Sequence, residues 1–281
     1  MKRSFKLSFS DAVFLLFLTV LVLTVSSTLV NTAPICVWCP LGLLPLVHTS
    51  VVGIASVLML FVFRKAWREQ REQGVILSLT TILCVMFFSQ ALIGARKLIQ
   101  SYPTHLVLLH SLTTISVWVL LVLLLYRSRS LVTEGVEPER LDTRQRIKDF
   151  LALSKPLIVG LLLITTYGGM VVGGKAWPSF SLTVWTLLGG ALAAGGSSAL
   201  NQYIDRHLDK YMQRTSKRPL PDGRLTGAEG LAFGLALSLA SYYTLAYLVN
   251  ELAALLSLAG IVYYVVVYSF WLCRFKSQVQ L

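Results

Sequence analysis

The sequence contains little charge, and acidic residues are its scarcest charged group. Only 14% of the 281 residues are charged, whereas a soluble domain carries about 25%. Apolar residues make up 55% of the chain, and its mean hydropathy is +0.69. This composition excludes intrinsic disorder, a coiled coil and an ordinary soluble enzyme.

The few charged residues are spaced so that long segments contain none. No charge lies between Asp11 and Arg64, and each later charge-free run is long enough for one membrane-spanning helix of about 20 apolar residues. The first run is long enough for two helices, with prolines marking a loop between them. We therefore predict an all-α, polytopic integral membrane protein with about eight transmembrane helices in two four-helix blocks. The predicted spans are 11–30, 47–63, 75–95, 106–126, 156–174, 180–202, 229–249 and 252–272.

Basic residues are distributed unevenly between the two sides that these spans define. With the N-terminus inside, 22 of the 25 Lys and Arg residues fall in inner segments, and only Arg96, Lys97 and Lys175 fall outside. Cytoplasmic loops of membrane proteins are enriched in basic residues in this way. The distribution predicts that the N-terminus and the aspartate-rich loop after the sixth span lie in the cytoplasm, and we expect a bacterial-type cell membrane. The distribution also accounts for the net charge of +12 without a nucleic-acid partner.

A charged segment, residues 127–150, separates the two blocks and holds five of the 13 acidic residues. The predicted parts are a first four-helix block over 1–130, a charged cytoplasmic linker over 131–150 and a second block over 151–281. From Asp142 onwards, charges alternate with apolar residues such as Ile147 and Phe150. Two interpretations stay open for this stretch: a short amphipathic helix at the inner membrane surface, or a solvated linker.

The most informative stretch, NQYIDRHLDKYMQRTSKRPL, begins where the sixth predicted span leaves the membrane on the inner side. Asn201, Asp205 and Asp209 are spaced so that a helix would stack them on one face. Two carboxylates and an amide oxygen are ligands that Mg²⁺ accepts, usually together with waters and substrate phosphates. The basic residues that follow could hold phosphate oxygens: Arg206, Lys210, Arg214, Lys217 and Arg218.

The competing interpretation is a solvated helix end in which Asp205 and Asp209 only pair with neighbouring basic residues. Acids are scarce in this chain, however, and these two lie where an apolar helix reaches water. Acids at such positions are functional candidates by default. The small residues of GGALAAGGSSALN, which precede the motif, permit close helix packing. The context therefore favours a binding site.

The motif N-x3-D-x3-D followed by R-T-x2-R-P-L resembles the UbiA superfamily of intramembrane prenyltransferases. Within it, the chain is most similar to the protohaem IX farnesyltransferase family, the haem O synthases. The resemblance is carried by SKP at 154–156, by the run from GGALAAGG to GRLTG at 189–227, and by LAALLSLAGIVYYVVVYSFWL at 252–272. His207 stands where the family more often has another acid.

The resemblance implies an enzyme that transfers the farnesyl group of farnesyl diphosphate to a vinyl group of haem b, in the biogenesis of haem A and terminal oxidases. It implies Mg²⁺ held by Asn201, Asp205 and Asp209, which form the catalytic motif. The implied diphosphate-binding residues are Lys155, Arg214, Lys217 and Arg218. Besides the two substrates, the implied partners are membrane lipid and haem A synthase or oxidase assembly proteins.

The family carries a second aspartate-rich motif after further helices, and this sequence ends at RFKSQVQL without one. We therefore expect a truncated gene product whose resemblance covers about the first half of the transferase. Two alternative functions stay open. One is a non-catalytic haem-binding membrane module, and the other is a UbiA-type prenyltransferase acting on a quinone precursor.

The first block contains two histidines that the predicted topology places at similar depth near the outer side. His48 and His110 could hold a cofactor between facing helices, or could lie in the helix interface and bond to water or carbonyls. In the outer loop, Cys36 and Cys39 face an oxidising compartment, so either a disulfide or an unpaired dithiol is open.

This block is similar to one four-helix half of the haem A synthase family. The resemblance is carried by the CVWCP cluster at 36–40, by SQALIGARKL at 89–98 and by the apolar run around His110. It implies that His48 and His110 ligate haem b. The oxidising half of that family has a Glu three residues before the first histidine, where this chain has Pro45. We therefore expect haem binding, haem delivery or a vestigial role, without oxidase chemistry.

Overall fold

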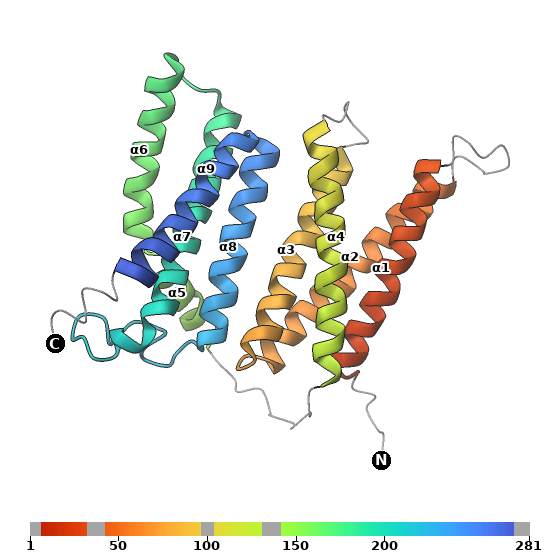
Figure 1. Cartoon of the computed structure of the whole chain (residues 1–281), viewed down its shortest axis with the longest axis horizontal. Helices are drawn as coiled ribbons and strands as arrows, with labels where there is room; N and C mark the ends of the chain where they lie inside the picture. The colour runs from red at the N-terminus through yellow and green to blue at the C-terminus, as the bar shows by residue number, and fades with distance from the viewer. Residues whose placement is uncertain (1–6, 33–42, 97–103, 131–141, 273–281) are drawn as a thin grey trace. The chain divides into compact units, whose positions relative to one another are not determined.

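The computed structural model describes residues 7–32, 43–96, 104–130 and 142–272. These residues are helical or connect helices, and they contain no β-strand. The predicted all-α fold is therefore confirmed. The helices are α1 (Phe9–Thr32), α2 (Leu43–Glu69), α3 (Gly74–Arg96), α4 (Thr104–Arg129), α5 (Thr143–Leu153), α6 (Pro156–Gly174), α7 (Phe180–Asp209), α8 (Gly227–Leu248) and α9 (Glu251–Val262), and α9 continues as the π-helix η2 (Tyr263–Leu272) (Figure 1).

Eight of the described helical segments are long and apolar enough to cross a membrane. They correspond one for one to the eight predicted spans, with ends that differ by a few residues, apart from the longer C-terminal ends of α2 and α7. Many of their large apolar side chains are exposed, and α6 buries no residue at all. Apolar surface of this extent suits contact with lipid. The chain is an integral membrane protein, and its orientation in the membrane stays a prediction.

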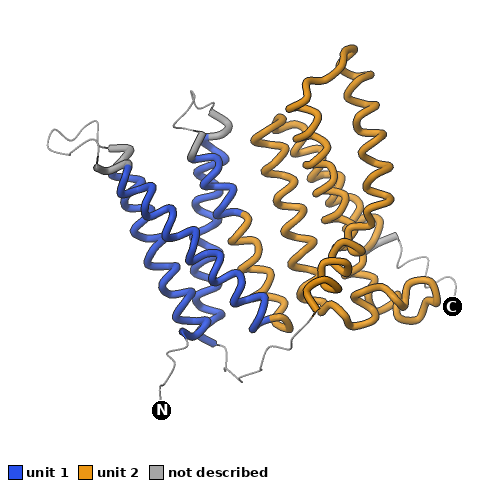
Figure 2. Tube along the Cα trace, turned by 180° about the vertical axis from the view of Figure 1, so that it is seen from behind, with its two compact units in different colours: residues 1–70, 86–138 blue, residues 71–85, 139–281 orange. Residues whose placement is uncertain are grey.

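The chain divides into two compact units, drawn in different colours in Figure 2. Unit 1 comprises Met1–Gln70 and Met86–Pro138, and unit 2 comprises Arg71–Val85 and Glu139–Leu281. The first half of α3 thus belongs to the second unit, although it precedes the linker in the sequence. The predicted domain boundaries at 130 and 150 stay predictions.

In unit 1, α1 packs against α2 and α4. The contact with α4 includes Trp118, whose indole Nε1 donates a hydrogen bond to Oγ1 of Thr24 at 3.2 Å. The same ring meets Phe17 edge to face, with centroids 5.5 Å apart. An indole N–H that is partly removed from water needs an acceptor, and a threonine of the neighbouring helix supplies it.

In unit 2, the main packing contact joins α7 to α8, and glycines allow the two helices to approach closely. A Cβ atom added to Gly196 would lie 2.8 Å from the backbone nitrogen of Ser238 and 3.0 Å from the carbonyl oxygen of Gly234. Gly234 in turn would meet Leu200 at 2.8 Å. The close packing predicted from the small residues before Asn201 is therefore confirmed.

We expect Gly196→Ala to destabilise unit 2 by about 1–3 kcal/mol, because the new methyl group meets backbone atoms that cannot move without separating α7 from α8. Thermal unfolding of the purified protein in detergent measures the effect. The matched control is Gly160→Ala in α6, where an added Cβ meets nothing within 4 Å. Equal melting temperatures for the two variants would contradict this account of the α7–α8 contact.

The stretch after Asp142 forms helix α5, so of the two open interpretations the helix is confirmed for residues 143–153. Asp142 caps it by accepting a hydrogen bond from the backbone N–H of Arg144 at 3.1 Å. Leu153 is buried in a cluster with Ala199, Leu220 and Leu225. These contacts hold α5 against the end of α7 and the loop that follows it. Its position at a membrane surface stays a prediction, and residues 131–141 lie outside the described part of the chain.

Candidate functional site

The aspartate-rich motif forms the last turns of α7, which continues beyond the predicted span to Asp209. Asn201 and Asp209 are buried, and Asp205 is half-buried. The side-chain amide of Asn201 donates to Oδ2 of Asp205 at 2.8 Å and to Oγ of Ser269 in η2 at 3.0 Å. The structure thus brings the first two motif residues into contact and ties them to the last described helix.

The basic loop after α7, residues 210–226, folds back onto the motif. Nη1 of Arg218 donates to Oδ2 of Asp209 at 2.8 Å, and the hydroxyl of Thr215 donates to the backbone carbonyl of Asp209 at 3.2 Å. From the other side, Nζ of Lys155 lies 3.5 Å from Oδ1 of Asn201. Cations therefore flank the motif at both ends.

A cavity of about 640 Å³ opens beside these contacts. Five basic residues, which we call the cavity cations, line it together with one acid. The cavity cations are Lys155, Arg214, Lys217, Arg218 and Arg224, and the other lining residues are Asp149, Ala152, Ile158, Gln202 and Pro219. All four residues predicted to bind diphosphate are among the cavity cations. The motif residues do not line the cavity, but Asn201 and Asp209 contact two residues that do.

Lys155 occupies an unfavourable position in this cavity. It connects α5 to α6 in the left-handed backbone conformation, with φ of 49°, which costs a non-glycine residue about 1–2 kcal/mol. Burial lowers the pKa of its ammonium group, and the positive charge of Arg218 lowers it further, while Asp209 and Asp205 oppose the shift. A bound anion would relieve this excess of positive charge, and strained residues of this kind gather at functional sites.

Comparison with known proteins places the motif and most of the cavity in one family. Residues 162–281 match the model of the UbiA prenyltransferase family. This segment is a UbiA-family domain. The resemblance predicted from the aspartate-rich motif is therefore confirmed, and the motif and four of the five cavity cations lie within the matched residues.

The curated relatives of the chain include several proteins named protoheme IX farnesyltransferase. The one from Roseiflexus sp. (strain RS-1) is 33% identical over 252 residues, covering 82% of this chain and 47% of the relative. The one from Streptomyces avermitilis is 49% identical over 133 residues, covering 47% of this chain and 44% of the relative. The one from Clavibacter michiganensis subsp. michiganensis is 43% identical over 147 residues, covering 52% of this chain and 48% of the relative. No solved structure gives a significant match.

The chain spans about half the length of the curated relatives it matches. The Roseiflexus alignment covers too much of this chain to be confined to unit 2, so it extends into residues before the linker. The likeness to that protein therefore includes part of unit 1 as well as unit 2. The predicted truncation and the likeness to haem A synthase stay predictions.

Sequence reasoning missed two charged residues that line the cavity, Arg224 and Asp149. Arg224 donates to Asp149, to Asp222 at 2.8 Å and to the backbone carbonyl of Lys217 at 2.8 Å. Arg224 could have been found, because it ends the same basic loop as Arg218. Asp149 could not, since it lies in the charged segment between the two blocks, where one more acid is no signal.

Two other basic residues that could have held phosphate do not line the cavity. Arg206 stacks over the ring of Tyr203, with its guanidinium carbon 4.1 Å from the ring centroid, and donates to the backbone carbonyl of the same tyrosine. Lys210 is exposed at the C-terminal end of α7. The structure therefore separates Arg206 and Lys210, at the end of α7, from the later basic residues of the loop, which gather in the cavity.

The motif could hold a metal ion only together with a ligand. Among the described residues, no three His, Cys, Asp or Glu side chains are grouped in a way that could bind a metal. Asp205, Asp209 and Asn201 offer hard oxygen donors that are too few for octahedral Mg²⁺, and the amide nitrogen of Asn201, not its oxygen, faces Asp205. Mg²⁺ usually keeps waters and bridges to phosphates, so this donor set beside a cationic cavity fits such an ion.

The two histidines of unit 1 form hydrogen bonds with residues of two different helices. Nδ1 of His48 lies 3.0 Å from the hydroxyl of Ser26 in α1, and Nε2 of His110 lies 3.1 Å from the side-chain amide of Gln90 in α3. A ligating imidazole usually donates its second N–H to an acceptor. The Ser26 hydroxyl can accept from His48 in this way, whereas the Gln90 amide nitrogen can only donate to His110. Haem binding by His48 and His110 stays a prediction, and Cys36 and Cys39 lie outside the described residues.

Proposed function

We propose that this protein binds farnesyl diphosphate through the cavity cations and transfers the farnesyl group to a vinyl carbon of haem b, giving haem O for the biogenesis of haem A and terminal oxidases. One observation carries the proposal. The four residues expected to bind diphosphate line one cavity next to an N-x3-D-x3-D motif, in a chain with a UbiA-family domain. The names of the relatives support farnesyl as the donor group and protohaem as the acceptor.

The cavity offers two kinds of cation to a diphosphate. Arg214 and Arg218 present planar guanidinium groups that can bind two phosphate oxygens at once, whereas Lys155 presents a compact point charge. Arg214 is exposed at the cavity, so its side chain can close onto a ligand. Arg218 bridges the cavity and Asp209, which would connect the diphosphate site to the aspartate-rich motif.

The reaction breaks the bond between the farnesyl C1 carbon and the diphosphate oxygen, and the electron pair leaves with the oxygen. The cavity cations stabilise the negative charge that develops on that oxygen. Magnesium, when bound by Asn201, Asp205 and Asp209, would supply further positive charge to stabilise the leaving diphosphate. The vinyl group of haem b donates its π electrons to the allylic cation, and water then adds with loss of a proton to give the hydroxyethylfarnesyl substituent.

Membranes that contain the full chain, incubated with farnesyl diphosphate, Mg²⁺ and haem b, should produce haem O, detected by mass in the extracted haems. A full-length protoheme IX farnesyltransferase serves as the parallel control. If the relative produces haem O and this chain does not, the catalytic proposal is wrong, and the chain is a binding module. A prenylated quinone precursor in place of haem O would assign a different acceptor.

We expect Arg214→Gln to weaken the binding of inorganic pyrophosphate about tenfold, because it removes one charge-assisted contact. Arg214 has no side-chain partner in the described structure, so its replacement should leave the fold intact. Calorimetric titration of the purified chain in nanodiscs measures the affinity. Arg206→Gln is the matched control, because Arg206 stacks on Tyr203 outside the cavity. Equal affinities for the two variants would contradict the assignment of the cavity as the diphosphate site.

A further inference from the structure

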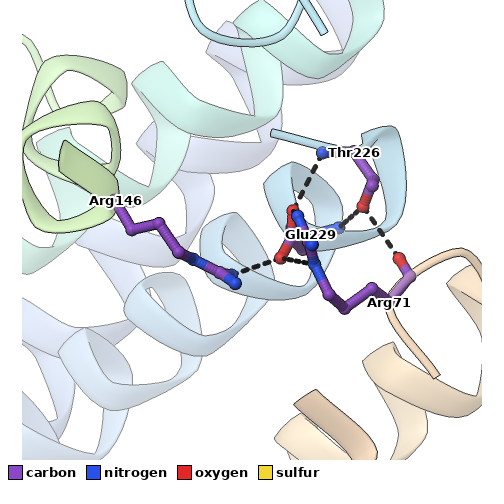
Figure 3. Close-up of polar contacts among 4 residues, drawn as sticks. All are labelled: Arg71, Arg146, Thr226 and Glu229. Atoms are coloured by element: carbon purple, nitrogen blue, oxygen red, sulfur yellow. Dashed lines mark hydrogen bonds and ion pairs between the residues drawn. The ribbon is translucent and has the colours of Figure 1, made fainter. Parts of the chain in front are cut away.

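Glu229 is a fully buried carboxylate near the start of α8, and two arginines from other segments hold it (Figure 3). Its Oε1 accepts hydrogen bonds from Nε of Arg71 at 2.8 Å and from Nη2 of Arg146. Its Oε2 accepts from Nη2 of Arg71 at 3.2 Å and from the backbone N–H of Thr226 at 2.9 Å. Both carboxylate oxygens are therefore satisfied, as a buried charge requires.

The residues around this carboxylate join three segments that are far apart in the sequence but belong to one unit. Arg71 precedes α3 and lies 158 positions from Glu229, whereas Arg146 lies in α5, 83 positions away. The hydroxyl of Thr226 also donates to the backbone carbonyl of Arg71 at 2.8 Å. We call Arg71, Arg146, Thr226 and Glu229 the Glu229 clamp.

The Glu229 clamp is attached to the cavity wall along two routes. Thr226 ends the 210–226 loop, and Arg224, two residues earlier, lines the cavity. On α5, Arg146 precedes Asp149 by about one helical turn, and Asp149 accepts a hydrogen bond from Arg224. Helix α5 and the loop are therefore tied together twice, once at the clamp and once at the cavity.

We infer that the Glu229 clamp is a positioning device for the cavity. It keeps α5 and the 210–226 loop in the arrangement that gathers the cavity cations, and this inference rests on the proposed binding of a diphosphate there. Helix α5 ends at Leu153, two residues before Lys155, so a shift of α5 would also move that cation. The loop supplies the remaining four cavity cations, and its C-terminal end is fixed at Thr226.

The side chains of the Glu229 clamp do not line the cavity. They cannot contribute by touching the diphosphate, so apart from the long-range effect of their charge, any effect they have on its affinity must pass through the residues that line the wall. Arg224 is the one nearest to the clamp in the sequence, and its side chain donates to Asp149 of α5, while Gln202 contacts the other end of α5 at Leu153. The inference therefore makes a specific statement: Arg146 acts on anion binding through Arg224.

Arg146→Gln tests this statement without unpairing Glu229, because the two hydrogen bonds from Arg71 remain. With the full chain in nanodiscs, we expect faster amide hydrogen exchange in residues 210–226 and affinity for inorganic pyrophosphate about tenfold lower, the loss of one charge-assisted interaction. The matched control is Arg144→Gln. It removes the same charge from the same helix at an exposed position whose side chain forms no hydrogen bond or ion pair in the described structure. Exchange and affinity in Arg146→Gln equal to those in the control would overturn the inference.

A double-mutant cycle with Arg224→Gln separates positioning from a general loss of structure. If Arg146 acts through Arg224, the single effects on pyrophosphate affinity are not additive, and Arg146→Gln has little further effect in the Arg224→Gln background. Additive effects on pyrophosphate affinity would show that Arg146 does not act through Arg224, and would overturn that part of the inference. If the unmodified chain binds no pyrophosphate, the proposed function fails instead. The hydrogen-exchange comparison of Arg146→Gln with Arg144→Gln then still decides whether the clamp holds the loop.

Discussion

Asp205→Asn is expected to lower the rate of farnesyl transfer by about 10²–10³-fold, the usual loss when one group that stabilises transition-state charge is removed. The side chain keeps its shape and can still contact Asn201, which lies 2.8 Å away. It loses one of the two negative charges that the motif offers to a divalent cation. The fold should therefore persist while Mg²⁺-dependent chemistry is lost. The rate of haem O formation in membranes containing the full chain measures the effect.

The binding of pyrophosphate with and without Mg²⁺ shows where the loss arises. In Asp205→Asn, the part of the affinity that depends on Mg²⁺ should disappear, while the part due to the cavity cations remains. Asp11→Asn is the matched control, because Asp11 is an exposed acid in α1 of unit 1 whose contacts are with Ser8. If Asp205→Asn retains transfer activity, Asp205 is not a metal ligand. The assignment of the cavity cations to the diphosphate would not be affected by that result.

The helices were predictable because the pattern that identifies them lies in consecutive residues of the sequence. A membrane-spanning helix needs an uninterrupted apolar stretch, so the gaps between charges mark each span directly. The same rule ends the sixth predicted span near residue 202, because it treats charged residues as outside the span, whereas the spacing of the motif predicts that the helix itself continues. The helix continues to Asp209, since the motif residues are polar but compatible with helix, and the loop folds back to contact its last turn.

The site was predictable only where its residues are neighbours in sequence. Arg214, Lys217 and Arg218 follow the aspartate-rich motif within a few positions, so the pattern shows a basic cluster without any knowledge of the fold. Lys155 was identified through the family resemblance. Asp149 and the partners of Glu229 left no local pattern, because a contact over 83 or 158 residues is decided by tertiary packing.

Glu229→Ala is expected to cause the largest loss of stability in unit 2, about 3 kcal/mol. Removing one partner of a buried ion pair costs about 3–5 kcal/mol, and the lower value applies because the side chains of Arg71 and Arg146 remain 18% and 22% exposed. The change leaves both guanidinium groups without their carboxylate. It also removes the capping box in which Glu229 and Thr226 bond each other's backbone N–H at the start of α8. Thermal unfolding in detergent should show a lower melting temperature than that of the unmodified chain.

The matched control for Glu229→Ala is Glu69→Ala, because Glu69 also forms an ion pair but is 39% exposed and pairs with Lys65 one turn earlier on the same helix. Exposed pairs of this kind contribute at most about 0.5 kcal/mol. Glu229→Gln should fall between the two alanine variants, since the amide oxygen still accepts a hydrogen bond while the charge is lost. If Glu229→Ala melts at the same temperature as Glu69→Ala, the buried carboxylate does not hold α3, α5 and α8 together. The connections of unit 2 would then depend on apolar packing alone.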